Sequence, residues 1–433
     1  MSGPRVLVVG TGARKHALVR RLVAEGCSEV WTAPSNPALD STGALPAPAP
    51  VEPPRRLTDW AADRRIELAV VLDESLLFQG LADALLHVGV PCVGPTRAAA
   101  VLEQSKTFGK DVMTAAEVPT PPWRAFPSAL AALADCASWS YPAVVKVDGP
   151  PLGTGVRIVD DAQGARSALR DILAREVATA AVLVEEFVPG PEYSFSVLTD
   201  GRGGLVLLPV IHEYNRVARD SRSALTRGMG AVAPAPVDDR VADIVFGALG
   251  RMLLEMAELG RPYVGSATTN VVVGPDGPVL LEVNSHFGDP ETQTVLPLLD
   301  VTLVDLLLAT AHGSLAGTTD LRTSPLASVT TTVARDGYPG GPRHDVVLPS
   351  ALLSDADLLF YETRRTGHGL TPSGGRVVSC NATAPDLETA AAQARATAAL
   401  VAASLGGVTF RDDIGTTTAD LAVSAPTSRQ ESP

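Results

Sequence analysis

The chain has 433 residues, more than one hydrophobic core usually organises, so we expect several domains. Hydrophobic residues make up 45% and charged residues 19%, a composition typical of globular proteins and too apolar for a disordered chain. The formal net charge is −13 and no basic run compensates it, which argues against nucleic acid as a partner.

The four cysteines are scattered and no Cys-x-x-Cys pair occurs, which argues against a disulfide framework and against a zinc site. The N-terminus enters an apolar run directly, with no basic leader segment and no cleavage site. A stretch of about 18 apolar residues, as a membrane-spanning helix requires, is absent. We therefore expect a cytoplasmic protein that does not bind membranes.

Apolar runs alternate with helical patterns over the first hundred residues, which is typical of an open, mostly parallel sheet. A second unit of mixed strands and helices follows, and a third begins near residue 327 and ends near residue 415. The predicted strands are 5–9, 29–32, 67–72, 90–93, 143–147, 181–185 and 327–333, and the predicted helices are 16–23, 81–86, 97–117 and 160–172.

Lysine is rare in this chain. It occurs only at Lys15, Lys106, Lys110 and Lys146, and the other 31 basic residues are arginine. A composition that replaces lysine by arginine wherever either serves would keep lysine where a compact ammonium is needed. This hypothesis directs attention to Lys106 and Lys146.

The first candidate site lies between the strand 5–9 and the following helix. Gly10 and Gly12 open the helix, whose backbone amides favour an anion, and Arg14 can add a charged contact. The alternative is a tight structural turn without a ligand. The loop is a poor dinucleotide fingerprint because Lys15 stands where the third glycine belongs, so a nicotinamide dehydrogenase is disfavoured.

The second candidate is the strand that contains Lys146 and the loop that follows it. A lysine within an apolar strand is costly unless its ammonium faces an anion. The glycines Gly149, Gly153 and Gly155 let backbone N–H groups approach a phosphate closely. The alternative is an edge-strand lysine that reaches solvent beside a hairpin.

The third candidate is the end of the strand 181–185. Phe187 and Val188 can form an apolar slot for adenine, and Glu192 can accept hydrogen bonds from a ribose diol. Taken alone this signal is weak, because acidic residues are common at strand ends.

The fourth candidate is the strand that contains Glu282, Asn284 and His286. Alternate residues of a strand point to one face, so the carboxylate and the amide oxygen would lie side by side. Such hard oxygen ligands suit Mg²⁺ bound to a polyphosphate. A solvated strand face is the alternative, but it does not explain the polar run at 288–292 that follows.

In order and spacing these segments resemble the ATP-grasp superfamily and, within it, the phosphoribosylamine–glycine ligase family. The resemblance spans nearly the whole chain. Its segments include VLVVGTGARKHAL at 6–18, APSNPA at 33–38, VVKVDG at 144–149, VEEFVPGPEYSF at 184–195, RGMGA at 227–231, LEVNSHFGDPETQ at 281–293, SGGRV at 373–377 and DIG at 413–415.

The resemblance implies a multidomain α/β fold with a Rossmann-like N-terminal domain, an ATP-grasp pair and a C-terminal α+β domain. The expected domains are 1–103, 104–325 with a smaller subdomain at about 120–190, and 326–423, followed by a disordered tail at 424–433. The implied reaction activates a carboxylate with ATP as an acyl phosphate, which an amine captures as an amide. The cofactors would be ATP and Mg²⁺ or Mn²⁺, the partners a small carboxylate and a small amine, and the protein a monomer or homodimer.

The resemblance also implies roles for individual residues. The residues implied to bind ATP are Lys106, Lys146, Gly153, Glu185, Phe187, Val188 and Glu192, the metal ligands Glu282 and Asn284, the catalytic residues His286 and Arg216, and the substrate-binding residues Gly12, Arg14, Asp289 and Glu291.

Several positions depart from the family pattern. Lys15 replaces a glutamate, Thr154 a lysine of the glycine-rich loop, Asn215 a lysine, and His286 an arginine that would steady the transferred phosphoryl group. Because the changes gather in loops expected to meet the acid and amine, we first expect a ligase redirected to another substrate pair. The alternatives are the glycine-dependent reaction of purine synthesis and a nucleotide-binding protein with impaired turnover.

Overall fold

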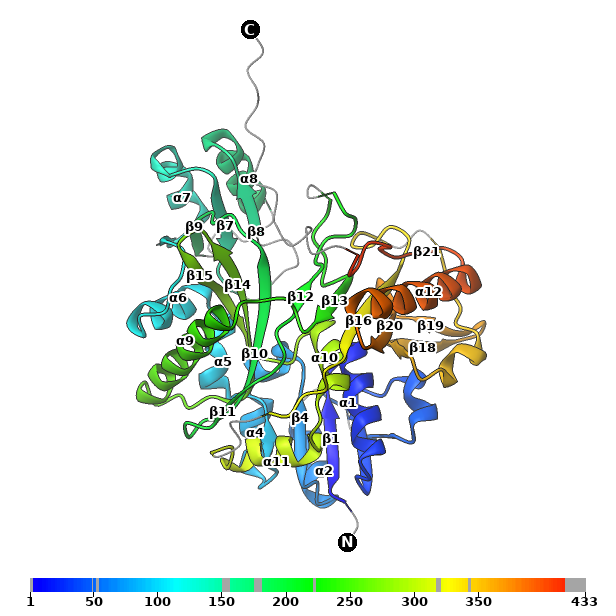
Figure 1. Cartoon of the computed structure of the whole chain (residues 1–433). Helices are drawn as coiled ribbons and strands as arrows, with labels where there is room; N and C mark the ends of the chain where they lie inside the picture. Colours follow the sequence, from blue (N-terminus) through cyan, green and yellow to red (C-terminus); the bar gives the residue numbers. More distant parts are fainter. Residues whose placement is uncertain are drawn as a thin grey trace.

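The computed structural model describes residues 3–48, 50–51, 54–149, 156–174, 181–220, 223–316, 321–341 and 344–416, and within them the chain forms five sheets (Figure 1). In these parts of the chain no helix is both long enough and apolar enough to cross a membrane.

The N-terminal sheet is entirely parallel, with the strand order β3-β2-β1-β4-β5. Its central strands are continuous apolar runs because helices cover both of their faces. This confirms the predicted parallel sheet. The strands are β1 (Arg5–Val9), β2 (Glu29–Ala33), β3 (Leu45–Pro46), β4 (Leu68–Val71) and β5 (Cys92–Val93), and the helices are α1 (Ala13–Ala24), α2 (Pro54–Asp63), α3 (Glu74–Phe78) and α4 (Leu81–His87).

The single helix predicted at 97–117 is wrong, because the structure divides it into α5 (Arg97–Gln104) and α6 (Lys106–Ala115). Ser105 between them adopts an extended backbone, and its hydroxyl caps α6 by accepting a hydrogen bond from the Phe108 amide. The break places Lys106 at the first turn of a new helix.

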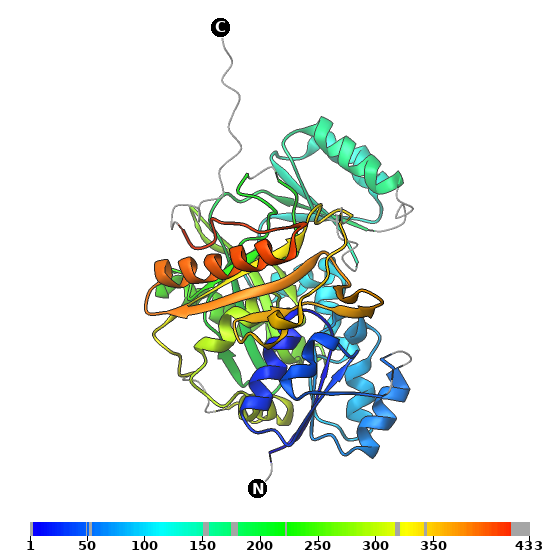
Figure 2. The same cartoon turned by 90° about the vertical axis from the view of Figure 1, so that its right-hand side faces the viewer.

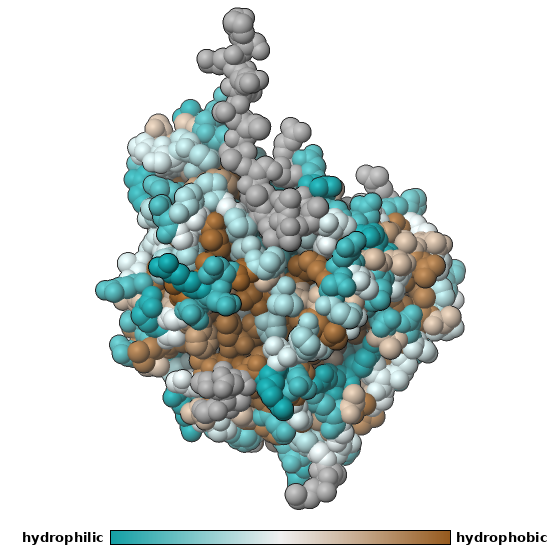
Figure 3. All heavy atoms as spheres, in the orientation of Figure 1, coloured by the Kyte–Doolittle hydropathy of each residue, from teal (hydrophilic) through white to brown (hydrophobic). Residues whose placement is uncertain are grey.

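The central sheet is antiparallel, with the order β11-β10-β14-β15, and packs against α9 and α6 through one apolar cluster. A register shift between Asn270 and Val271 interrupts the pairing of β14 with β15. In the space-filling view, apolar surface gathers where α9 lies beside β10 (Figure 3). The elements are β10 (Glu192–Asp200), β11 (Leu205–Leu207), α9 (Asp239–Glu258), β14 (Val264–Gly274) and β15 (Gly277–Asn284).

A smaller antiparallel sheet, with the order β6-β9-β7-β8, carries two helices on one face and stands at the top of the molecule in both views (Figures 1 and 2). Its register pairs Val144 with Glu185, so Lys146 and Glu185 share a face. The elements are β6 (Trp123–Phe126), α7 (Ala129–Asp135), β7 (Ala143–Val147), β8 (Val156–Val159), α8 (Ala162–Ala174) and β9 (Val182–Glu186).

The last large sheet joins two distant parts of the chain, because β12 and β13 precede α9 in sequence and β13 pairs with the C-terminal strand β16. Helix α12 lies along this sheet (Figure 2). The strands are β12 (His212–Glu213), β13 (Gly230–Ala233), β16 (Ala327–Arg335), β17 (Leu358–Phe360), β20 (Arg376–Ala384) and β21 (Val408–Thr409), beside a hairpin of β18 (Thr363–Thr366) and β19 (Gly369–Pro372) and the helices α10 (Glu291–Val295), α11 (Leu303–His312) and α12 (Leu387–Leu405).

A buried histidine joins the N-terminal helix α1 to the C-terminal strand β17. His16 accepts a hydrogen bond through Nδ1 from the Phe360 amide at 2.9 Å, and its Nε2 lies 3.1 Å from Arg20. Burial, with the positive charges of Arg20 and Lys15, lowers the pKa of His16 to about 3. The imidazole is therefore neutral in the folded protein at pH 7.

We predict that His16 makes the protein acid-sensitive. The unfolded chain binds a proton near the ordinary pKa of 6.5 and the folded chain only near 3, so stability falls as the pH drops through that interval. His16→Asn keeps an acceptor for Phe360 but cannot be protonated. Between about pH 7.5 and about pH 5.5 its unfolding free energy should fall by about 1 kcal/mol less than that of the wild type. Equal falls in urea denaturation would contradict this.

Candidate functional site

The centre of the site is a buried carboxylate between two lysine ammonium groups. Glu185 Oε1 lies 2.9 Å from Lys110 Nζ, and its Oε2 lies 3.0 Å from Lys146 Nζ. Lys146 also lies 3.8 Å from Glu282 Oε2 at the end of the central sheet. The three inner side chains are at most 4% exposed. The cluster therefore connects β7 and β9 of the small sheet to α6 and β15.

The charges of this cluster support one another. Burial lowers the pKa of Lys110 to about 8 against the opposing effect of Glu185. Burial also opposes the charge of Lys146, but Glu282 and Glu185 outweigh it and raise its pKa. For Glu282, burial favours the neutral acid, yet Lys146 and its neighbouring lysines lower the pKa. All three groups are thus predominantly charged at pH 7.

Lys110 is the residue that the sequence analysis did not assign. The scarcity of lysine is the signal that points to it, because lysine occurs at only four positions in the chain. Its ammonium also donates a hydrogen bond to Thr120 Oγ1, and that hydroxyl donates to the Leu280 carbonyl at 2.8 Å. Lys110 therefore pairs with one oxygen of Glu185, while Lys146 pairs with the other.

Lys106 lies at the first turn of α6, beside the end of β7. Asp148 Oδ1 accepts a hydrogen bond from the Lys106 amide at 2.6 Å, and Lys106 Nζ donates to the Gly149 carbonyl at 3.3 Å. The strand that carries Lys146 is thus held against the helix that begins with Lys106. Gly153 and Thr154 of the following loop lie outside the described residues.

The residues predicted to flank the nucleotide base follow β9. The Phe187 amide donates to the Pro142 carbonyl at 3.2 Å, and Val188 packs close to the backbone of Gly274. Both side chains are half-buried, as a contact surface for a base requires. The Glu185 carboxylate, by contrast, points into the lysine cluster.

The predicted metal ligands and the predicted ribose ligand lie on neighbouring strands. Glu282 pairs with Asn270 in the β14–β15 register, and Asn270 Nδ2 donates to Glu192 Oε1 at 3.0 Å. Burial raises the pKa of Glu192, and Glu282 adds to this effect. Glu282 and Asn284 alternate along β15 and therefore share one face.

This donor set fits a magnesium ion that also holds phosphate. Among the described residues, groups of three histidine, cysteine or carboxylate side chains that could hold a metal are absent. Mg²⁺ commonly takes one or two protein oxygens and fills its shell with phosphate oxygens and water. Glu282 and Asn284 supply two oxygen-bearing side chains beside the lysine cluster.

His286, predicted as catalytic, comes directly after this strand. Its Nδ1 lies 3.3 Å from Oε2 of the buried Glu103, and the same oxygen accepts the Ser285 amide at 2.6 Å. Glu103 belongs to α5, so the N-terminal region orients the imidazole. A carboxylate at one ring nitrogen holds the ring in a defined orientation.

Asp289 is a hub that joins three parts of the chain. Its side chain accepts hydrogen bonds from the Arg14 amide, from Gln293 and from Tyr361, and Arg376 lies 3.3 Å away. Burial opposes its charge, but Arg376 and Arg14 lower its pKa. One of its oxygens also lies where a Cβ at Gly12 would stand, so this glycine permits the close approach.

The two basic residues of the first loop are also engaged within the fold. Arg14 donates through Nη1 to the Phe287 carbonyl at 2.5 Å and through Nε to the Thr11 carbonyl. Lys15 is fully buried, 2.8 Å from Glu362 Oε1 of the C-terminal region. Lys15, which departs from the family pattern, therefore forms an internal ion pair with Glu362.

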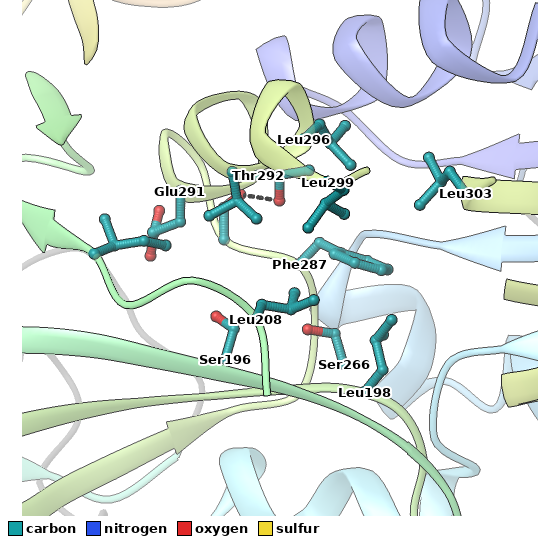
Figure 4. A pocket seen from close by; sticks show the side chains of 13 residues that line it. Ser196, Leu198, Leu208, Ser266, Phe287, Glu291, Thr292, Leu296, Leu299 and Leu303 are labelled. Carbon is teal, nitrogen blue, oxygen red and sulfur yellow. Dashed lines mark hydrogen bonds between the residues drawn. The ribbon is translucent and has the colours of Figure 1, made fainter. Parts of the chain in front are cut away.

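Glu291 and Glu213 face the same interior region. Burial raises the pKa of both carboxyls, and each is raised further by a neighbouring carboxylate, Asp289 for Glu291 and Glu291 for Glu213. Beneath Glu291 lies a cavity of about 20 Å³ lined mainly by apolar side chains such as Phe287 (Figure 4). This volume suits a single water molecule, so substrates must bind elsewhere.

Three family models match the chain in order. They describe the N domain of phosphoribosylglycinamide synthetase (residues 4–103), its ATP-grasp (A) domain (104–292) and its C domain (328–417). A phosphoribosylamine–glycine ligase from Streptomyces coelicolor is 37% identical over 419 residues, which cover 95% of this chain and 98% of the relative. The chain belongs to the phosphoribosylglycinamide synthetase family.

Solved structures agree with this assignment. A phosphoribosylamine–glycine ligase from Thermotoga maritima superposes with a TM-score of 0.79 and 25% identity over 94% of this chain and 99% of that one. The biotin carboxylase domain of 2-oxoglutarate carboxylase from Hydrogenobacter thermophilus, solved with MgADP and bicarbonate, gives 0.71 at 16% identity, with 95% and 92% covered. The second likeness shows the fold alone.

As a phosphoribosylglycinamide synthetase family member, the chain is an ADP-forming carbon–nitrogen ligase that uses ATP with Mg²⁺. The predicted multidomain ATP-grasp fold is confirmed. The individual site residues stay predictions, and the structure gathers most of those it describes around the end of β15.

We predict that Glu185 is essential for stability. Glu185→Ala removes the counter-charge of the buried Lys110 and the nearer of two counter-charges of the buried Lys146, which should lower the unfolding free energy by about 3–5 kcal/mol in urea denaturation. The control is Glu186→Ala at the exposed neighbouring position, expected to change it by less than about 0.5 kcal/mol. Similar losses in both variants would contradict the assignment.

Proposed function

We propose that this enzyme joins glycine to 5-phosphoribosylamine with ATP, the reaction of purine synthesis. The observation that carries the proposal is the meeting of two chemically different regions at the end of β15. On one side lie Lys146 and the oxygen side chains of Glu282 and Asn284, suited to a metal-bound triphosphate. On the other side lie Asp289 and Glu291, beside positive charges from Arg14 and Arg376.

In this mechanism a carboxylate oxygen of glycine attacks the γ-phosphorus of ATP, and the bond to ADP breaks. The amine then attacks the acyl carbon of the resulting acyl phosphate, phosphate leaves, and the amine loses a proton. When bound, Mg²⁺ neutralises charge on the phosphate oxygens. Lys146 and Lys106 would hold the phosphates, and His286, oriented by Glu103, would lie near the transferred group.

The comparisons favour this reaction over the redirected substrate pair that the sequence first suggested. A ligase whose name specifies glycine and phosphoribosylamine is 37% identical over 95% of the chain. Lys15 is one of the departures that suggested a redirected ligase, and it also has a structural explanation, because its ammonium pairs with Oε1 of Glu362. The departure at His286 likewise has a partner in Glu103.

The direct test is phosphate release from Mg-ATP by the purified protein with glycine and freshly generated 5-phosphoribosylamine. We expect release that requires both substrates together. Release with a different amine or acid, and none with this pair, would restore the redirected reading. ATP binding without release for any pair would support the impaired protein.

Glu282 should be needed for turnover. Glu282→Gln removes the carboxylate charge at the predicted metal site, and we expect kcat to fall about 100-fold or more in the phosphate-release assay. Glu258→Gln, at an exposed position on α9, serves as the matched control and should stay within about twofold of the wild type. Near-normal turnover by Glu282→Gln would remove the metal assignment.

His286 should act on the chemical step. We expect His286→Ala to lower kcat by about 10- to 100-fold, with the KM for ATP within about twofold of the wild type. A raised KM for ATP with unchanged kcat would instead assign His286 to nucleotide binding. An unaffected variant would show that the imidazole only packs against Glu103.

A further inference from the structure

The connection between β12 and β13 carries Arg216 toward the site. Its two stems, residues 214–217 and 225–229, pair with each other through Thr226 N to Asn215 O at 2.7 Å. Arg216 donates through Nη1 to the Ser223 carbonyl at 2.7 Å, and its charge lowers the pKa of Glu192 against the larger effect of burial. The connection begins beside Glu192, because His212 Nδ1 lies 3.0 Å from the Glu192 carbonyl oxygen. Arg216 therefore lies near the carboxylate that is predicted to bind the ribose.

A buried arginine near the end of the described chain holds the first stem. Arg411 forms a two-pronged pair with Asp413, with Nε to Oδ1 at 2.8 Å, and both side chains are about nine-tenths buried. Its Nη1 donates to the Arg216 carbonyl at 3.2 Å, and its guanidinium lies 5.0 Å from the centre of the Tyr214 ring. The Tyr214 hydroxyl accepts the Gly415 amide at 3.1 Å.

A second C-terminal arginine holds the other stem. Arg376 Nη1 donates to the carbonyls of Arg227 and Asp289, the latter at 2.8 Å. The Tyr338 hydroxyl accepts the Arg227 amide at 3.1 Å. Both stems are therefore fixed by residues of the segment that matches the C-domain model, although the connection itself lies in the segment that matches the ATP-grasp model.

We propose that Arg411 is a positioning residue, which holds the Arg216 backbone and the Tyr214 ring so that the Arg216 guanidinium stays near Glu192 in the predicted nucleotide site. This role does not depend on which acid and amine the enzyme joins. The C-terminal segment 411–415 would thus set the affinity for ATP without touching it.

The chemistry of the contact explains why an arginine is needed. One planar guanidinium serves a carboxylate, a carbonyl and an aromatic face at the same time, which a lysine ammonium cannot do. Burying such an ion pair costs desolvation and adds little net stability compared with apolar packing. In the proposal, the gain from this arrangement is a single geometry for the Arg216 side chain near Glu192.

The first test needs no substrate. In Arg411→Lys, amide hydrogen exchange at residues 214–217 and 225–229 should quicken about tenfold or more, while amides of β10 and β14 keep their rates. The matched control is Arg395→Ala, because Arg395 donates to the Asp412 carbonyl of the same segment at 3.1 Å but contacts neither stem. Unchanged exchange in the stems, or equal quickening in the control, would overturn the proposal.

The second test uses kinetics. Arg411→Lys should raise the KM for ATP about tenfold and leave the KM values for the acid and the amine within about twofold. Adding Arg411→Lys to Arg216→Ala should cost little further, because both changes remove the same interaction. Additive losses would overturn the proposal.

A milder variant guards against the case in which Arg411→Lys simply misfolds. Asp413→Asn keeps the shape of the Arg411–Asp413 pair and should give smaller changes in the same amide exchange rates and in the same KM. Faster exchange throughout the core of both variants would overturn the proposal. If the wild type shows no turnover with glycine and 5-phosphoribosylamine, the proposed function fails, and the exchange test still decides the role of Arg411.

Discussion

One carboxylate, that of Glu185, allows this site to hold two lysines in a nearly dry environment. Without it, the buried Lys110 would lose its ion-pair partner, and Lys146 would keep only Glu282, 3.8 Å away, as a counter-charge. The contact also joins separate layers, because Lys146 belongs to the small sheet, Lys110 to α6 and Glu282 to the central sheet. The same interaction therefore supports both the electrostatics of the site and its architecture.

Asp289 has a comparable role on the substrate side. Its partners come from α1, from α10 and from the C-terminal sheet, so one side chain joins the three segments that the family models match. The aspartate is held charged by Arg376 and Arg14 although it is buried. An aspartate that holds these segments together can still contact substrate, since a carboxylate has several acceptor positions.

Much of this organisation could be predicted from sequence. The parallel N-terminal sheet followed from alternating apolar runs, and the placement of Glu282 and Asn284 on one face of a strand followed from their spacing. The break at Ser105 was missed, because only the Asp148 side chain, distant in sequence, shows why the backbone there is extended. Lys110 was missed for the same kind of reason, since its partner Glu185 is visible only once the sheets are assembled.

The pairing of β13 with β16 bears on how this protein could be divided. A fragment that begins after residue 325 would lack the strand that covers one edge of β16 and would expose an open row of backbone groups. A fragment that ends before residue 325 would keep β13 but leave it without its partner strand β16. The three segments that the family models match are therefore poor units for separate expression. Fusion partners would be better tolerated at the ends of the chain than at the boundaries between these segments.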